Sequence, residues 1–71
     1  MKEFYAVVIN SNFTTRFFKN RDNAFAYLWQ EYLNEFADMY MEEELEGAKE
    51  ELNYLWVLGD FGYIETCGFE D

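Results

Sequence analysis

The chain has 71 residues, of which 23% are aromatic, and it carries a formal net charge of −10 at pH 7. A chain of this length forms a single domain, residues 1–71. It has neither a cysteine pair for a disulfide nor a histidine for a structural zinc site, so its stability must come from apolar packing.

The negative charge is concentrated in the later part of the sequence. From Asp22 onward, fourteen acidic residues stand against one basic residue, Lys49, which gives this segment a charge of −13. The first 21 residues carry a charge of +3. Such a field repels nucleic acid and anionic membranes and attracts basic surfaces. We therefore expect a basic protein partner and no direct contact with nucleic acid or membrane.

The sequence contains few features that indicate a cellular compartment. The apolar run at residues 4–9 is shorter than the roughly 7–15 residues of a signal-peptide core. No run approaches the roughly 18–20 apolar residues of a membrane span. The only cysteine, Cys67, suits a reducing compartment and is expected to be a small, half-buried strand residue. These features predict a cytoplasmic protein.

The first 18 residues predict a β-hairpin. Residues 4–9 are β-branched and aromatic without strict alternation, which indicates a strand covered on both faces or nearly so. Residues 10–12 have turn chemistry, because Asn and Ser side chains hydrogen-bond to their own backbone. Residues 13–18 return as a second strand, with Phe13, Thr15 and Phe17 on one face.

An amphipathic helix is predicted next, capped by Asp22 or Asn23. At about 100° per residue, its apolar side chains fall within a sector about 140° wide, with Trp29 near the centre. These side chains are Phe25, Leu28, Trp29, Tyr32, Leu33, Phe36 and Tyr40.

A second apolar stripe follows at helical spacing. It points about 140° away from the first stripe, so one straight helix cannot bury both stripes against one sheet. We therefore predict a kink or break between Tyr40 and Gly47, giving a long helix and a shorter one. The second stripe consists of Met41, Leu45, Ala48 and Leu52.

The C-terminal segment predicts two more strands, at residues 54–58 and 63–67, joined by a turn at residues 59–62. Residues 53–56 can instead extend the second helix, which leaves one C-terminal strand. The order of elements predicts an α+β fold. Its small antiparallel sheet combines the N-terminal hairpin with the C-terminal strands, and a long, kinked or broken helical segment packs on one face.

The sequence lacks the residues and motifs that enzymes most often use for catalysis. Histidine is absent, Cys67 has no imidazole to activate it, and no glycine-rich phosphate motif occurs. Paired carboxylates can cleave glycosides, but a domain of this size is small for a sugar cleft. We expect a non-enzymatic protein with no catalytic residues and no cofactor.

The carboxylates of the helical segment are spaced to form rows. A spacing of 4-3-4 predicts a ridge about 16 Å long, opposite the first apolar stripe, formed by Glu31, Glu35, Asp38 and Glu42. A second row is predicted from Glu43, Glu46 and Glu50, and Glu44 and Glu51 extend the negative charge along the same helix. Four further acids are candidates to lie near this row: Asp60, Glu65, Glu70 and Asp71. Like charges four residues apart cost about 0.2–0.5 kcal/mol per pair. A solvated surface is the alternative explanation, but such surfaces ordinarily mix charge signs.

A calcium site is the rival use for clustered acids. An EF-hand loop needs oxygen ligands at alternating positions around a glycine, whereas the acids of residues 42–47 stand at helical spacing. We therefore predict no metal site.

Two rows of fixed carboxylates approach the phosphate spacing of DNA, about 3.4 Å along each strand. In size, charge and the acidic helical segment at residues 31–51, the chain resembles the small DNA-mimic inhibitors that phages and mobile elements make against nucleases, restriction enzymes and CRISPR effectors. The resemblance rests on no sequence motif. It implies an anti-CRISPR or anti-restriction inhibitor, acting in the host cytoplasm if phage-encoded, whose acidic rows bind the nucleic-acid-binding surface of a basic effector.

The alternative function is a small structural or regulatory module that forms a homodimer through exposed aromatic side chains. In such a dimer the basic hairpin residues Arg16, Lys19 and Arg21 would meet the acidic helix of the other copy. Neutralisation of their own helix is an equally good explanation for these residues.

Overall fold

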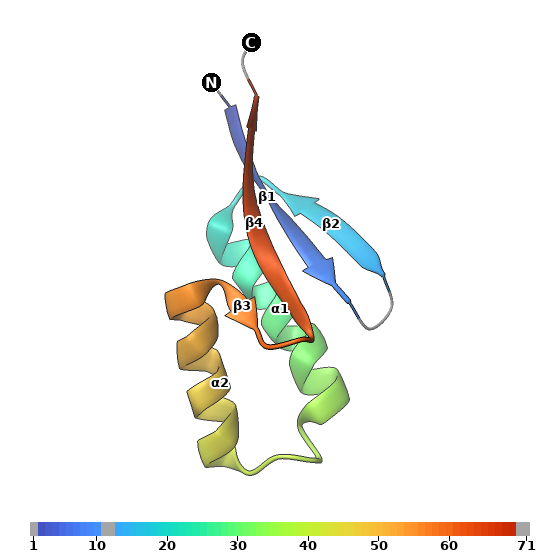
Figure 1. The fold of residues 1–71 in the computed structure, drawn as a ribbon, viewed down its shortest axis with the longest axis vertical. Coiled ribbons are helices and arrows are strands. Elements are labelled where there is room, and N and C mark those ends of the chain that lie inside the picture. Colours follow the sequence, from blue (N-terminus) through green and yellow to red (C-terminus); the bar gives the residue numbers. More distant parts are fainter. Residues whose placement is uncertain (1, 11–12, 70–71) are drawn as a thin grey trace.

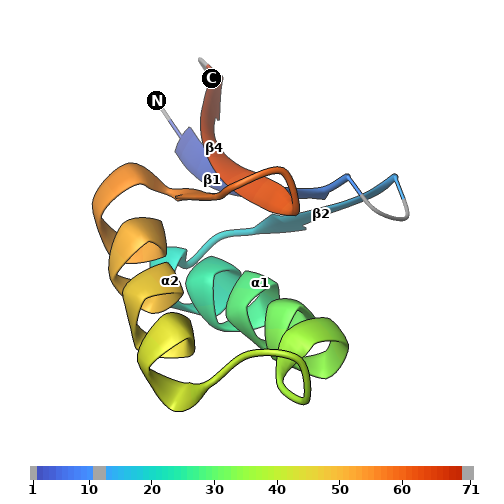
Figure 2. The ribbon, with the colours of Figure 1, turned by 60° about the horizontal axis from the view of Figure 1, so that its bottom comes forward.

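The structure, a computed structural model, describes residues 2–10 and 13–69. Its elements, in chain order, are β1 (Lys2–Ile9), β2 (Thr14–Phe18), α1 (Arg21–Phe36), α2 (Glu42–Leu55), β3 (Val57–Leu58) and β4 (Gly62–Phe69). The described strands form a four-stranded antiparallel sheet in the order β2-β1-β4-β3. Both helices lie on one face of this sheet (Figures 1 and 2). The predicted α+β fold class is confirmed.

The predicted hairpin is confirmed, with its second strand beginning at Thr14. Ser11 and Asn12 of the predicted turn lie outside the described residues. No described helix or strand covers the face of β1 opposite the helices, but none of residues 4–9 is exposed, so the predicted coverage of this strand on both faces nearly holds. On that open face Ala6 is still buried, since it is small and its cross-strand neighbours are Phe17 and Glu65.

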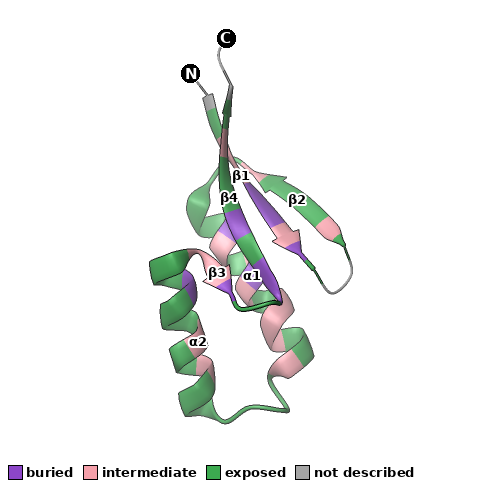
Figure 3. Ribbon diagram, viewed as in Figure 1, coloured by how far each residue is buried: buried purple, intermediate pink, exposed green. Residues whose placement is uncertain are grey.

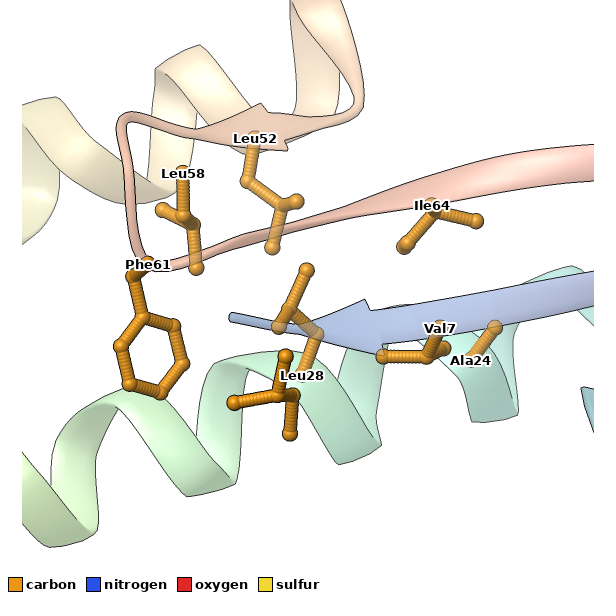
Figure 4. Close-up of a cluster of buried hydrophobic side chains, with 8 residues drawn as sticks. Val7, Ala24, Leu28, Leu52, Leu58, Phe61 and Ile64 are labelled. Atoms are coloured by element: carbon orange, nitrogen blue, oxygen red, sulfur yellow. The ribbon is translucent and has the colours of Figure 1, made fainter. Parts of the chain in front are cut away.

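The hydrophobic core lies between the sheet and the two helices (Figure 4). Leu28 occupies its centre on α1 and is fully buried, whereas Trp29 is only half-buried. The buried face of α1 therefore centres on Leu28 and not on Trp29. The core cluster consists of Val7, Ile9, Ala24, Leu28, Leu52, Leu58, Phe61 and Ile64.

Helix α1 begins earlier than the predicted caps allow. Asn20 is the N-cap, with an extended backbone, and its side-chain oxygen accepts a hydrogen bond from the Asn23 N–H at 3.2 Å. Satisfying a free N–H of the first turn in this way is the usual role of an Asn cap. The prediction of Asp22 or Asn23 as the cap is therefore wrong, and Asp22 instead lies in the first turn.

The helical segment breaks as predicted, but at residues 37–41 instead of between Tyr40 and Gly47. Tyr40 lies in the connection, and its ring packs on Phe36 with centroids 5.4 Å apart. Met41 is the N-cap of α2 and is exposed, while Gly47 lies within α2. The two helices have 16 and 14 residues, so they are nearly equal in length.

Helix α2 extends through Leu55, which decides between the two predictions for residues 53–56 in favour of a helix. Trp56 then ends it with a left-handed backbone (φ 63°), donating its N–H to the Leu52 carbonyl. The predicted strand at residues 54–58 is therefore wrong in length, because only Val57 and Leu58 remain for β3.

The predicted turn after β3 is confirmed at residues 59–61. One residue of this turn, Phe61, is buried and packs in the hydrophobic core. Gly62 begins β4 at a point where a Cβ would lie 2.5 Å from the Val8 carbonyl oxygen. Only glycine allows the two backbones to approach this closely. Phe61 and Gly62 together bring the turn down onto α1.

Candidate partner-binding surface

The predicted acidic ridge of Glu31, Glu35, Asp38 and Glu42 does not exist as one helical row. Glu31 and Glu35 lie on α1, Asp38 lies in the connection, and Glu42 is the first residue of α2. The prediction is wrong because it required one helix to continue past Phe36. The structure does not bring these four carboxylates together on a single helix.

Glu31 and Glu35 also do not lie opposite the buried face of α1. They follow Ala24 and Leu28 at a spacing of 4-3-4, so all four side chains share one side of the helix. Glu31 is half-buried, while Glu35 is exposed near the C-terminal end of α1. One side of α1 is thus apolar over the sheet and acidic beyond it.

The predicted second row is present on α2. Glu43, Glu46 and Glu50 are all exposed, and helical spacing places them on the side of α2 away from its inward residues. Most of α2 is exposed (Figure 3). Those inward residues are Leu45, Ala48 and Leu52. We call Glu43, Glu46 and Glu50 the α2 row. At about 1.5 Å per residue it is about 10 Å long.

Three basic side chains of the described residues lie over aromatic rings. The Lys49 Nζ atom is 6.0 Å from the Trp29 ring centroid. Arg16 lies over the Tyr27 ring at 4.9 Å, and Arg21 lies over the Phe25 ring at 5.1 Å. Within residues 2–10 and 13–69, no carboxylate of the α2 row has a Lys or Arg within ion-pair distance. The row therefore carries uncompensated negative charge.

Part of the acidic charge has a structural explanation. Glu42, Glu43 and Glu44 lie in the first turn of α2, whose N-cap forms no side-chain hydrogen bond. Carboxylates there interact favourably with the helix dipole, each by about 0.3–1 kcal/mol. Glu46 and Glu50 lie beyond this turn and repel each other at a spacing of four residues. Helix stability does not explain these two residues.

A cleft of about 510 Å³ opens between the C-terminal end of α1, the helix α2 and the β3–β4 turn. Four aromatic side chains form one wall of this cleft. We call it the Tyr32 cleft, because the Tyr32 ring contacts the three other rings of that wall. The Tyr32 ring centroid is 5.0 Å from Phe36, 6.4 Å from Tyr40 and 5.4 Å from Phe61. This wall joins two segments that are far apart in the sequence.

Three carboxylates line the Tyr32 cleft, on Glu35, Glu51 and Asp60. Burial, Tyr40, Glu51 and Glu44 raise the pKa of the Tyr32 hydroxyl above its ordinary value, in decreasing order of effect. The cleft is therefore negative as well as aromatic. The sequence predicted Glu51 among the acids of the second helix and Asp60 as a neighbour of the second row, but it did not predict that they line one cleft with Glu35. Of the other predicted neighbours, Glu65 lies on β4, and Glu70 and Asp71 lie outside the described residues.

Neither metal ligation nor membrane spanning finds support in the described chain. No three of its His, Cys, Asp or Glu side chains are grouped as metal ligands would be. Cys67 is a free thiol, half-buried in β4 as predicted. Neither described helix is both long and apolar enough to span a lipid bilayer.

Comparison of the chain with protein-family models, curated proteins and solved structures found no match. Its function must therefore be argued from its own surface.

Proposed function

We propose that the chain is a cytoplasmic, non-enzymatic inhibitor that binds the nucleic-acid-binding surface of a basic protein, such as a nuclease or a CRISPR or restriction effector. Its carboxylates stand in for phosphates, as in anti-CRISPR and anti-restriction DNA mimics. The observation that carries the proposal is the exposed pair Glu46 and Glu50, which repel each other on α2 and form no ion pair with a Lys or Arg of the described residues. Such a surface attracts lysines and arginines that ordinarily contact phosphates.

The spacing of the acids supports this proposal. Three carboxylates in the α2 row give one charge per about 5 Å of helix, compared with about 3.4 Å per phosphate on one DNA strand. Glu44 and Glu51, seven residues apart, form a parallel row on another side of α2. Two rows on one rigid helix bring the charge density close to that of a strand.

The proposal predicts a steep loss of binding when the α2 row is neutralised. A variant with Glu43, Glu46 and Glu50 changed to Gln should capture its target from cell lysate at least about tenfold less well, a loss of about 1.4 kcal/mol. The measurement is affinity capture with mass spectrometry at 0.05 and 0.15 M salt, with and without duplex DNA as competitor. The control removes the same number of charges from three exposed acids elsewhere, with Glu3→Gln, Asp22→Asn and Glu65→Gln.

The expected result is capture of nucleic-acid-binding proteins by the wild type and by the control. Both salt and DNA should release them, because screening shortens the reach of exposed charges to about 8 Å at physiological ionic strength. The same proteins retained by the α2-row variant, or retention that DNA does not reverse, would refute the mimic.

A homodimer is the second candidate, and the open face of the sheet favours it. Phe17 is 64% exposed there and packs edge-on against Phe4 with ring centroids 5.4 Å apart. Tyr63 lies on the same face, with Val8 and Val57 as its cross-strand neighbours. Two copies joined by these faces would place their acidic helices on opposite outer sides, where the mutual repulsion is smallest.

This second candidate predicts a concentration-dependent dimer. Sedimentation equilibrium between 5 and 200 µM should show self-association of the wild type, and Phe17→Ser should weaken it because the serine removes the most exposed ring of the described sheet residues. Phe13→Ser, which alters an even more exposed ring in the β1–β2 turn, is the control. A monomer throughout this range would exclude the dimer as the functional form.

A further inference from the structure

We propose that the Tyr32 cleft binds the guanidinium group of an arginine side chain on the protein partner. This assignment rests on the proposed function, which requires a basic partner, and it adds the specific chemistry of one contact. The cleft lies between the α1 end, α2 and the β3–β4 turn, beside the acidic residues of α2 but separate from the α2 row.

The aromatic wall offers ring faces to a cation. Tyr40 is 39% exposed, so part of its ring is accessible at the mouth of the cleft, and the Tyr32 ring lies nearly parallel to it at 18°. Phe61 is almost fully buried and meets Tyr32 edge-on, at 83°. The buried ring holds the partly exposed rings in place, so the wall is formed before a ligand arrives. A cation over the face of such a ring is attracted by its quadrupole.

Charge complementarity selects a cationic occupant. Glu35, Glu51 and Asp60 come from three separate elements and all line the cleft. Asn10 fixes the turn that carries Asp60, donating its side-chain N–H to the Asp60 backbone carbonyl at 3.1 Å. The Asp60 carboxylate takes no part in that bond. No lysine or arginine of the described chain lines the cleft, so its negative charge is open to an external cation.

Arginine suits these walls better than lysine or a bare ion. Its guanidinium is planar, stacks on aromatic faces and donates two parallel hydrogen bonds to a carboxylate. The chain's own Arg21 already lies over aromatic rings, 5.1 Å from the Phe25 centroid and 5.2 Å from the Trp56 centroid. The cleft volume of about 510 Å³ falls within the roughly 300–1,000 Å³ range of small-ligand sites and accommodates one long side chain.

The test is an NMR titration of the whole chain with short peptides and no macromolecular partner. Ac-Gly-Arg-Gly-amide should bind with a dissociation constant of about 1 mM, as expected for a single side chain, and should shift the ring signals of Tyr32 and Tyr40. The matching citrulline peptide, which has the same shape without the charge, should not bind. The lysine peptide should bind more weakly than the arginine peptide.

Variants locate the site within the cleft. Glu51→Gln and Tyr40→Leu should each lower the affinity for the arginine peptide by about three- to fivefold. Glu3→Gln removes the same charge from an exposed site on β1 and should leave the affinity unchanged. Because Glu51 is exposed, its substitution keeps the test valid even if Tyr40→Leu disturbs the fold.

Equal binding of the citrulline or lysine peptide, or an equal loss with Glu3→Gln, would overturn the arginine site. Capture of nucleic-acid-binding proteins by a chain whose cleft ignores the arginine peptide would overturn this site alone. Arginine-specific binding in a chain that captures no such protein would overturn the proposed function alone.

Discussion

Replacing Leu28 with alanine is expected to lower the free energy of unfolding by about 2–5 kcal/mol, a large part of the stability of a domain with roughly 0.05–0.15 kcal/mol per residue. Leu28 is fully buried on α1, at the centre of the core between the sheet and the helices. Its Cδ1 atom lies so near Gly62 that a Cβ there would be 3.1 Å away. Removing the isopropyl group leaves a cavity that these rigid neighbours cannot fill.

Urea denaturation followed by far-UV circular dichroism measures this loss. Trp29→Ala is the comparison, because Trp29 is the next residue on the same helix and is only half-buried. Its ring stacks on Tyr32 at 5.4 Å and lies under Lys49, so its removal should cost about 1–2 kcal/mol in lost ring contacts. If Trp29→Ala lowered the free energy of unfolding more than Leu28→Ala, the buried face of α1 would centre on Trp29, as the sequence predicted.

Replacing Trp56 with alanine is expected to cost about 3 kcal/mol. Its ring contacts Phe25 edge-on at 5.4 Å and Tyr5 at 6.0 Å, and Arg21 lies over it at 5.2 Å. These contacts join the start of α1, the end of α2 and strand β1. Thermal and urea unfolding of the variant should therefore show a large loss of stability even though Trp56 is only half-buried.

Trp56→Gly separates the ring from the backbone. Trp56 has a left-handed conformation (φ 63°) that costs a residue with a Cβ about 1 kcal/mol but costs glycine nothing. The glycine variant should therefore be about 1 kcal/mol more stable than the alanine variant. A glycine variant that is less stable than the alanine variant would show that Trp56 leaves the left-handed region when its ring is removed.

The fold class and the hairpin could be predicted because their signals are local. The opposite orientations of Phe17 and Phe18 follow from the two-residue period of a strand, and pairing with Ala6 and Tyr5 places them on opposite faces of the sheet. The incompatibility of the two apolar stripes likewise follows from helical geometry alone. It predicted that a break must occur, and the structure confirms that break.

The acidic site could be predicted only in part. The α2 row was predictable because Glu43, Glu46 and Glu50 share one uninterrupted helix. The ridge was not, because α1 ends at Phe36, and the spacing of the carboxylates carries no information about where a helix ends. The Tyr32 cleft was invisible in the sequence because its walls come from segments that are far apart along the chain.

The sequence by itself determined the sign and concentration of the charge, the period of each strand and the need for two helices. These are properties of residues within a few positions of one another. Only the tertiary structure decided that Tyr32 meets Phe61, and that Glu35, Glu51 and Asp60 line one cleft. Their positions depend on how the sheet and both helices pack together, because contacts between distant segments are fixed by shape and burial and not by spacing along the chain.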